Sequence, residues 1–249
     1  MNFLGIIPAR YASTRFPGKP LADICGKPMI QKVYEQASLA LKNVWVATDD
    51  KRIEDAVKAF GGKVVMTSKN HKSGTDRIAE AVRHITHNNK ISIDVVINIQ
   101  GDEPFIQPEQ INALKKCFNI DTTDIATLIK PISNEMEIFD PNKVKVVIGN
   151  NKQALYFSRS SIPYLRGIPK ENWIKKGKFY KHIGMYAYKH EVLMEITKLN
   201  QGNLEILESL EQLRWLENGY HIQTEITTHE SIGIDTPADL ERVKELGLL

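Results

Sequence analysis

Short apolar runs alternate with amphipathic segments through the first half of this chain, and this alternation limits the possible folds more than any other feature. Each run has the length of a strand, and apolar residues recur at helical spacing between the runs. Val95–Ile99 is almost unbroken, which is typical of a central parallel strand covered on both faces. We therefore expect an α/β fold with a mostly parallel sheet. Strands are expected at 3–7, 44–47, 63–66, 94–99 and 125–129, and helices at 28–41, 50–60, 75–87 and 108–118.

The alternation becomes less regular after about residue 130. Gly149-Asn150-Asn151 separates two short apolar runs, a pattern that predicts a hairpin and hence antiparallel additions to the sheet. Residues 163–178 are rich in Pro, Gly and charge, which predicts a long mobile connection. Further strands are expected at 143–148, 154–157, 182–188 and, as an edge strand, 221–227; further helices are expected at 191–199, at 204–217 and from a cap at Thr236 through Leu246.

The length of 249 residues is one at which an α/β fold still forms a single domain. We expect one domain over residues 1–249, with a subordinate lobe at about 130–200. The 33 basic and 30 acidic residues give a formal net charge of +3, so the balance of charge does not favour a nucleic-acid partner. Any useful positive field must therefore be local.

Cys25 and Cys117 stand alone, without a CxxC pair or a metal-like His spacing nearby. This pattern gives little support to a zinc site or a disulfide framework and indicates reduced cysteines. The N-terminus lacks a secretory pattern, and no apolar run approaches membrane-spanning length. We expect a soluble cytoplasmic protein without membrane insertion.

A basic loop follows the first expected strand and carries Arg10, Arg15 and Lys19. Ligands of open α/β sheets bind outside the carboxyl ends of the strands, so this loop is a candidate site for an anion such as a polyphosphate. The alternative is a solvated turn whose cations face water. The loop lacks the Walker A spacing, and no GxGxxG follows the strand, which disfavours a kinase, a GTPase or a dehydrogenase.

Two aspartates, Asp102 and Asp235, each follow an apolar segment directly. A Mg²⁺ ion on a nucleotide keeps mostly water and phosphate ligands and needs about one or two protein carboxylates. The pair is therefore a candidate metal site. Taken singly, each has an ordinary alternative, an Asx turn at Asp102 and a helix cap at Asp235.

Three weaker patterns could contact a nucleotide or a second substrate. Ser73 to Arg77 offers polar groups for a base or a phosphate, although helix capping alone selects Ser, Gly and Thr at a helix start. On an extended strand, His182, Gly184, Tyr186 and Tyr188 point one way and would suit a polyol, or else belong to a core. On one helix, Glu208, Glu211 and Gln212 lie at i, i+3 and i+4, where they could converge or form a solvated stripe.

Taken together, the motifs are more specific than any one of them. In order along the chain, they closely resemble those of the 3-deoxy-manno-octulosonate cytidylyltransferases, the CMP-Kdo synthetases. The matching segments are Ile7–Leu21, Gly26–Ile30, Val46–Asp49, Ser73–Arg77, Gln100–Pro104, Ala154–Arg159, Leu210–Arg214 and Ile234–Pro237.

The resemblance implies a three-layer αβα, Rossmann-like nucleotidyltransferase fold with a smaller sugar-binding and dimerisation lobe, in a homodimer. It implies an enzyme that joins CTP to the sugar acid Kdo, releases pyrophosphate and supplies lipopolysaccharide synthesis. By position, nucleotide contacts would come from Ala9, Arg10, Arg15, Lys19, Ser73, Gly74, Arg77 and Gln100. The sugar acid would face Arg159, His182, Tyr186, Glu211 and Gln212, and Mg²⁺ would bind Asp102 and Asp235.

Arg10, Lys19 and Asp102 would then be the catalytic residues. Transfer of this kind relies on in-line positioning and on neutralising the charge that builds up on the phosphates, and no side chain is evident as a base. Two alternatives remain at this point. One is a cytidylyltransferase for a related acid, such as an 8-amino analogue of Kdo or a sialic acid; the other is a nucleotide-binding regulatory module without turnover, against which the paired aspartates argue.

Overall fold

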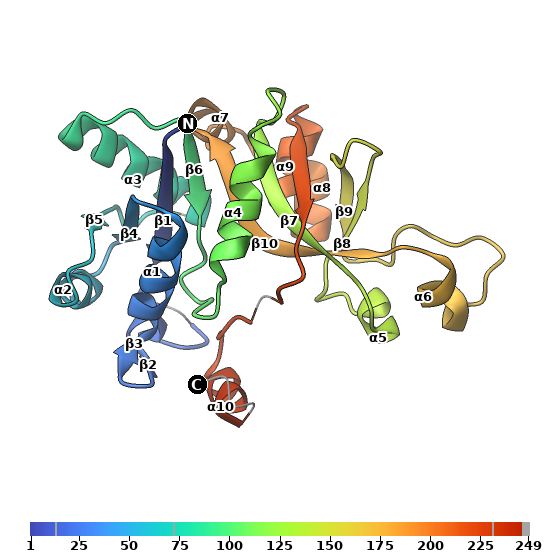
Figure 1. Cartoon of the computed structure of the whole chain (residues 1–249), viewed down its shortest axis with the longest axis horizontal. Coiled ribbons are helices and arrows are strands. Elements are labelled where there is room, and N and C mark those ends of the chain that lie inside the picture. The colour runs from blue at the N-terminus through green and yellow to red at the C-terminus, as the bar shows by residue number, and fades with distance from the viewer. Residues whose placement is uncertain (13, 72, 231, 246–249) are drawn as a thin grey trace. The chain divides into compact units, whose positions relative to one another are not determined.

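The computed structural model describes residues 1–12, 14–71, 73–230 and 232–245. The chain folds into two compact units, the first made of residues 1–112 with 231–249 and the second of residues 113–230. Strands and helices are mixed in both, and the predicted fold class, a mixed α/β fold with a mostly parallel central sheet, is confirmed (Figure 1). In the part of the chain that is described, no helix is both long enough and apolar enough to cross a membrane.

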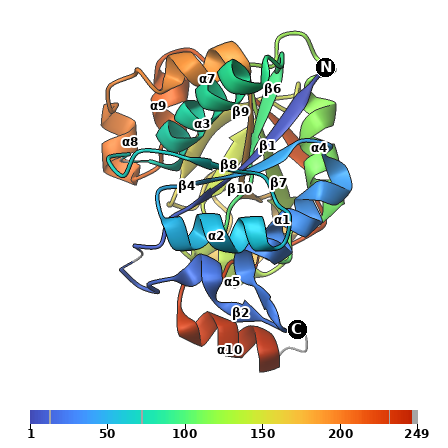
Figure 2. The same cartoon turned by 90° about the vertical axis from the view of Figure 1, so that its left-hand side faces the viewer.

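The first unit is built on a parallel sheet with the strand order β6-β1-β4-β5. The chain steps outward from β1 to β4 and β5 and then returns to the other side of β1. Because such crossovers are right-handed, α1 and α2 cover one face of the sheet and α3 covers the other (Figure 2). The elements are β1 (Phe3–Ala9), η1 (Lys19–Leu21), β2 (Asp23–Ile24), β3 (Lys27–Pro28), α1 (Met29–Ala40), β4 (Val44–Thr48), α2 (Lys51–Ala59), β5 (Val64–Met66), α3 (Gly74–Asn89) and β6 (Val95–Asn98).

Side-chain caps set the starts of the helices in this unit. Asp50 caps α2 by accepting the backbone N–H of Arg52. Ser73 caps α3 by accepting the N–H of Asp76, whose carboxylate accepts the N–H of Ser73 in return. Both caps satisfy amide groups that have no partner within the helix. The helices thus begin within about two residues of the expected positions.

Helix α10 (Pro237–Glu245) also begins as predicted, because Thr236 and Asp239 form a reciprocal cap. The predicted end at Leu246 lies outside the described residues. An apolar cluster packs α10 and the segment before it against the start of α1; its buried members are Ile24, Met29, Ile234 and Val243. This packing fixes the segment that carries Asp235.

The second unit contains five strands in the order β11-β7-β10-β8-β9. β7 and β10 are antiparallel with a bulge between Ile183 and Tyr186, β11 joins β7 in parallel, and β8 and β9 form the predicted hairpin. Helix α4 (Pro108–Cys117) leads into this unit, which contains β7 (Ile125–Pro131), α5 (Glu135–Phe139), β8 (Lys145–Ile148), β9 (Ala154–Ser158), η2 (Lys170–Asn172), α6 (Trp173–Lys176), β10 (Tyr180–Lys189), α7 (His190–Ile196), α8 (Asn203–Glu208), α9 (Gln212–Glu217) and β11 (Ile222–Ile226).

The prediction of one continuous helix over 204–217 is wrong. Ser209 has φ 52°, in the left-handed region, and it separates α8 from α9. The Arg159 guanidinium donates to the carbonyls of Glu208 and Ser209 at 2.8 and 3.3 Å. Those carbonyls would accept N–H groups in a continuous helix, so the arginine replaces the next helical turn. Glu208, Glu211 and Gln212 therefore do not share one helical face.

The connection at 163–178 carries structure that its composition did not predict. It contains η2 and α6, and Trp173 is buried. The Trp173 ring stacks on Phe179 with 5.8 Å between ring centroids, and its Nε1 donates to the carbonyl of Ile168 at 2.9 Å. Burial of one large aromatic side chain thus orders a segment rich in Pro, Gly and charge.

Candidate active site

A cavity of about 360 Å³ lies in the first unit, where β1 ends. The basic loop forms one part of its wall, and the turn after β6 and Asp235, two residues before α10, complete it. It is lined by Pro8, Ala9, Arg10, Ala12, Thr14, Arg15, Lys19, Pro20, Gln100, Gly101, Asp102 and Asp235. Seven predicted residues are thus brought together, since Ala9, Arg10, Arg15, Lys19, Gln100, Asp102 and Asp235 all line one cavity.

The Lys19 ammonium lies between the two aspartates at the centre of this wall. Its Nζ is 2.7 Å from Oδ2 of Asp102 and 3.0 Å from Oδ1 of Asp235. Arg15 reaches the same Asp235 oxygen at 3.2 Å but is much more exposed, 66% against 14% for Lys19. The contacts of Lys19 are therefore the better shielded from water, and they carry more of the interaction energy.

Burial and the carboxylates act on the pKa of Lys19 in opposite directions. Burial lowers it, but the charges and hydrogen bonds of Asp102 and Asp235 outweigh burial, so the pKa of Lys19 lies above its ordinary value of 10.5. The side chain is thus a fixed positive charge throughout the physiological range of pH. A fixed cation in a partly enclosed cavity suits the binding of a phosphate chain.

Asp102 and Asp235 fit the donor set of a Mg²⁺ site. Both carboxylates reach one cationic atom, so they face the same small space. Among the residues described, no group of three or more His, Cys, Asp or Glu side chains could hold a metal ion. Two carboxylates suffice for Mg²⁺ where phosphate and water supply the remaining ligands.

The position of Asp235 follows from two backbone features. The N–H of Ile234 donates to the carbonyl of Asp102 at 2.9 Å, which brings the two aspartates together over a long separation in sequence. A Cβ on Gly101 would lie 2.8 Å from the carbonyl oxygen of Pro8. Glycine is therefore required there for the turn after β6 to approach the end of β1.

Tyr11 holds the basic loop in shape, a role that the sequence did not reveal. Its ring lies under the Arg52 guanidinium, with 3.3 Å from Cζ to the ring centroid, and its carbonyl accepts the N–H of Gly18 at 2.9 Å. Gly18 has φ 74°, and a Cβ there would lie 3.1 Å from the Tyr11 ring. The glycine permits the turn that begins η1 and places Lys19 at its first residue.

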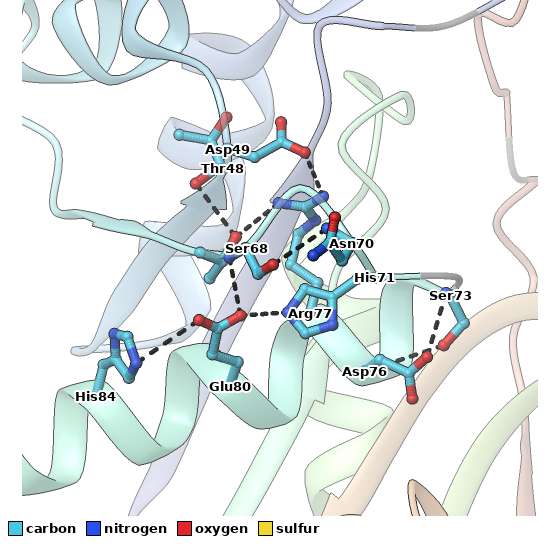
Figure 3. Close-up of polar contacts among 11 residues, drawn as sticks. Thr48, Asp49, Ser68, Asn70, His71, Ser73, Asp76, Arg77, Glu80 and His84 are labelled. Carbon is cyan, nitrogen blue, oxygen red and sulfur yellow. Dashed lines mark hydrogen bonds and ion pairs between the residues drawn. The ribbon is translucent and has the colours of Figure 1, made fainter.

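Ser73, Gly74 and Arg77 belong to the start of α3 and do not line the cavity. Gly74 adjoins it, since a Cβ there would lie 3.8 Å from Cγ of Pro8. Arg77 is fully buried and donates to Oδ2 of Asp49 at 2.6 Å, so its guanidinium faces protein rather than a ligand (Figure 3). The predicted nucleotide contact through this side chain has no support in the geometry.

The residues predicted for the sugar acid all belong to the second unit. The rings of His182 and Tyr186 lie 5.2 Å apart, and a Cβ on Gly184 would meet nothing within 4 Å. The two rings therefore contact each other, and there is open space beside Gly184. Burial lowers the pKa of His182 to about 3, so the imidazole is neutral at pH 7, with its Nε2 at 2.9 Å from Thr127 Oγ1.

Arg159, another residue predicted to face the sugar acid, is engaged within the protein together with Glu208. Arg159 donates to the carbonyl of Pro141 at 3.1 Å as well as to the end of α8. Glu208 accepts from the Ser158 hydroxyl at 2.6 Å and from the N–H of Arg159 at 2.9 Å. Glu211 is partly exposed, and Gln212 is buried at the start of α9.

A parallel sheet that carries a basic loop and two convergent carboxylates at the carboxyl ends of its strands is typical of enzymes that act on nucleotides. The chain belongs to the cytidylyltransferase family, whose sequence profile matches residues 4–232, and among its members it groups with the 3-deoxy-manno-octulosonate cytidylyltransferases.

Two relatives with that name illustrate the similarity. The protein of Parabacteroides distasonis is 61% identical over 246 residues, which is 97% of this chain and 96% of the relative. The protein of Bacteroides thetaiotaomicron is 60% identical over 248 residues, 98% of each chain. Because these matches run along nearly the whole of both chains, the shared family extends to both units.

Solved structures agree. A CMP:2-keto-3-deoxy-manno-octonic acid synthetase complexed with CTP superposes with a TM-score of 0.90 at 45% identity, over 100% of this chain and 99% of the other. A glucose-1-phosphate thymidylyltransferase from Bacillus anthracis has a TM-score of 0.58 at 18% identity, covering 98% and 94% of the two chains. The second similarity concerns the fold alone.

Proposed function

We propose that this cytidylyltransferase activates Kdo with CTP, giving CMP-Kdo and pyrophosphate for lipopolysaccharide synthesis. The observation that carries the proposal is the position of Lys19 between Asp102 and Asp235 in a cavity at the end of β1. The relatives named for this reaction and the similar synthetase complexed with CTP support the choice of both substrates.

The basic loop would bind the triphosphate. Arg10, Arg15 and Lys19 line one cavity, and Lys19 is already ordered by two carboxylates, so little side-chain entropy is lost when a phosphate binds there. In the reaction a bond forms between the anomeric oxygen of Kdo and the α-phosphorus, and the bond from that phosphorus to the leaving pyrophosphate breaks. Lys19 and Arg10 neutralise the charge that develops on the leaving group, and the hydroxyl proton passes to solvent.

Asp102 and Asp235 would hold Mg²⁺, which when bound supplies positive charge to the phosphate oxygens. Their convergence on Nζ of Lys19 supports this assignment, because an arriving cation would find two carboxylates already directed at one point. The phosphates in turn would provide a new partner for the Lys19 ammonium.

The sugar acid would bind to the face formed by His182 and Tyr186 in the second unit. A neutral imidazole and a phenol are hydrogen-bonding groups suited to sugar hydroxyls, and Gly184 leaves space beside them. Arg159, Glu211 and Gln212 are the remaining candidates, with Arg159 assigned to the carboxylate of the acid. The three carbonyl contacts of Arg159 use one N–H each on Nε, Nη1 and Nη2, which leaves two of its five N–H groups to donate to that carboxylate.

Two further proposals concern the protein in the cell. We infer that it acts as a homodimer in the cytoplasm, as its resemblance to the CMP-Kdo synthetases implies. Light scattering coupled to size exclusion should give about twice the mass of 28.3 kDa. A monomer at micromolar concentration would remove the dimer from the proposal.

The test of the reaction is pyrophosphate release with Asp102→Asn as the variant. The amide keeps the shape of the side chain but loses its charge, so we expect near-complete loss of activity at preserved folding. Full activity would remove the metal assignment. A panel with Kdo, its 8-amino analogue and a sialic acid at saturating CTP identifies the acceptor, and a higher kcat/KM for one of the other acids would replace Kdo in the proposal.

A further inference from the structure

Two side chains of α3 hold the segment of residues 67–71, which follows β5 (Figure 3). Arg77 donates to Oγ1 of Thr67 at 2.6 Å. Glu80 accepts the N–H of Ser68 at 2.9 Å, and the same oxygen pairs with Nε2 of His71. The segment is thus fixed near both of its ends by residues one turn apart on a single helix.

The Glu80 carboxylate is suited to this task at neutral pH. Burial raises the pKa of Glu80, but the His71 hydrogen bond, the N–H of Ser68 and the charges of His71 and His84 outweigh burial, so the pKa lies below its ordinary value. The side chain is therefore ionised at pH 7, and both contacts are charge-assisted. Its second oxygen faces His84 at 3.7 Å, on the side away from the 67–71 segment.

Arg77 extends the connection to the sheet. It binds Asp49, which follows β4, as well as Thr67, whose hydroxyl donates in turn to the carbonyl of Thr48 at 3.2 Å. The end of β4, the 67–71 segment and α3 are thus joined through one buried guanidinium. These contacts of a buried guanidinium are costly to lose, so they favour one conformation of the segment, although Nε of Arg77 has no hydrogen-bond partner among the described residues.

The 67–71 segment ends two residues before Ser73 in the sequence, and Ser73 begins the helix that adjoins the active-site cavity. Ser73 caps α3, and Gly74 lies against Pro8, which lines the cavity. The charged wall of that cavity suits a polyphosphate, whereas the start of α3 offers neutral groups. These are the backbone of Gly74 and the hydroxyl proton of Ser73, since the hydroxyl oxygen and the N–H of Ser73 are taken up by the cap. Neutral donors and acceptors are what distinguish cytosine from uracil, because the two rings differ in hydrogen-bonding groups rather than in charge.

We propose that Glu80 is a positioning residue that presents Ser73 and Gly74 to the pyrimidine ring and so sets the selectivity for CTP over UTP. His71 is its partner, and Arg77 is the second anchor of the segment. The proposal rests on the proposed function for the identity of the nucleotide. A held segment has already lost its conformational freedom before the ligand binds, which increases affinity without a new contact. Releasing the segment should weaken nucleotide binding and reduce discrimination, while the phosphate and metal groups stay intact.

The experiment measures the Kd of Mg-CTP and Mg-UTP by calorimetry on the full chain, with Glu80→Ala, Glu80→Gln and His71→Ala. We expect a Kd for CTP at least about tenfold higher in Glu80→Ala and about threefold higher in His71→Ala, with a smaller preference over UTP in both. Glu80→Gln can still accept from Ser68 and from a neutral imidazole, so it should recover most of the affinity. His84→Gln is the matched control, because it removes the contact to the other Glu80 oxygen, and it should bind CTP as the wild type does.

Kinetics separate positioning from a general structural defect. In Glu80→Ala the KM for CTP should rise with the Kd, whereas kcat and the KM for Kdo should stay within about twofold. Unchanged CTP affinity in a folded Glu80→Ala or His71→Ala protein would overturn the proposal, as would an equal loss for both nucleotides or a matching defect in the Kdo step. His71→Ala decides the matter if Glu80→Ala does not fold. The calorimetry needs no turnover, so a failure of the proposed function would appear separately, as tight CTP binding without pyrophosphate.

Discussion

Replacement of Lys19 by Met tests the role of the positive charge at the centre of the candidate active site. The change keeps the length and apolar stem of the side chain and removes the one charge that contacts both Asp102 and Asp235. Two carboxylates then face the cavity with no cation between them, and in the proposed reaction the leaving pyrophosphate loses one of the positive charges that would neutralise it. Catalysis and stability should both respond, for separate reasons.

The catalytic effect should be the larger one. Loss of a positioned charge at the transferring group typically costs on the order of 100- to 1,000-fold in rate. Lys19 is only 14% exposed, so water compensates poorly, and we expect the upper part of this range. Lys19→Arg keeps the charge but not the shape of the ammonium group and should recover only part of kcat.

The effect on stability should be about 1 to 3 kcal/mol at pH 7, the usual value for hydrogen bonds to charged groups. Because the pKa of Lys19 is raised in the folded protein, the stabilisation is fully present below its ordinary value of 10.5 and is lost as the pH rises further. The difference between Lys19→Met and wild type in urea unfolding should therefore shrink at high pH.

A continuous assay of pyrophosphate release, with CTP and Kdo both varied, gives kcat and both KM values. Circular dichroism and urea unfolding check that the variant is folded. A fall in kcat/KM of less than about tenfold would refute a direct role for Lys19. An unchanged free energy of unfolding would refute the view that the lysine is what stabilises the facing carboxylates.

Three further predictions concern other parts of the chain. Gly101→Ala should lower the free energy of unfolding by about 1 to 3 kcal/mol in urea and impair activity, since the added Cβ would lie 2.8 Å from the backbone oxygen of Pro8. A variant as stable as the wild type would contradict that close approach. Burial lowers the pKa of His182 to about 3, so below pH 6.5 the unfolded chain binds a proton that the folded protein does not, and the free energy of unfolding should fall by about 1.4 kcal/mol per pH unit towards acid. His182→Gln should lose this dependence on pH. If the variant keeps the same slope, another group is responsible for it. Burial raises the pKa of Cys117 to about 12, so a thiol reagent at pH 8 should titrate Cys25 alone until the protein unfolds; two fast thiols would contradict this.

The sequence predicted the first unit well because its signals there are local. Apolar runs, turn residues and caps lie within a few positions of the elements they define, as at Ser73 and Thr236. The cavity was predictable for a related reason: residues that follow parallel strands meet at one edge of a sheet, so Lys19 and Asp102 could be expected to approach.

The features that the sequence did not predict have a shared physical cause, which is contact between residues distant in sequence. The burial of Arg77 against Asp49 and Thr67 is one of them. Ser209 breaks a helix whose pattern is continuous, because Arg159 takes up the carbonyls around the break. Asp49 and Thr67 are too far from Arg77 in sequence, and Arg159 is too far from Ser209, for these contacts to appear as a periodic pattern.

The stacking of Tyr11 under Arg52 escaped prediction in the same way. Thr14 and Ala12 line the cavity without having been assigned to it, although both belong to the basic loop. A loop motif identifies the segment that forms a site, but it does not tell which of its side chains face the ligand and which support the loop.

The central claim is that the chain transfers the cytidylyl group of CTP to Kdo. Phosphorus NMR of the purified chain with CTP, Kdo and Mg²⁺ tests it most directly, because substrate and both products are seen in one spectrum. We predict that the triphosphate resonances are replaced by those of pyrophosphate and a phosphodiester in equal amounts, and that omission of Kdo leaves CTP intact. Bound CTP that persists unchanged with Kdo and with each related acid would contradict the claim and identify the chain as a nucleotide-binding module without turnover.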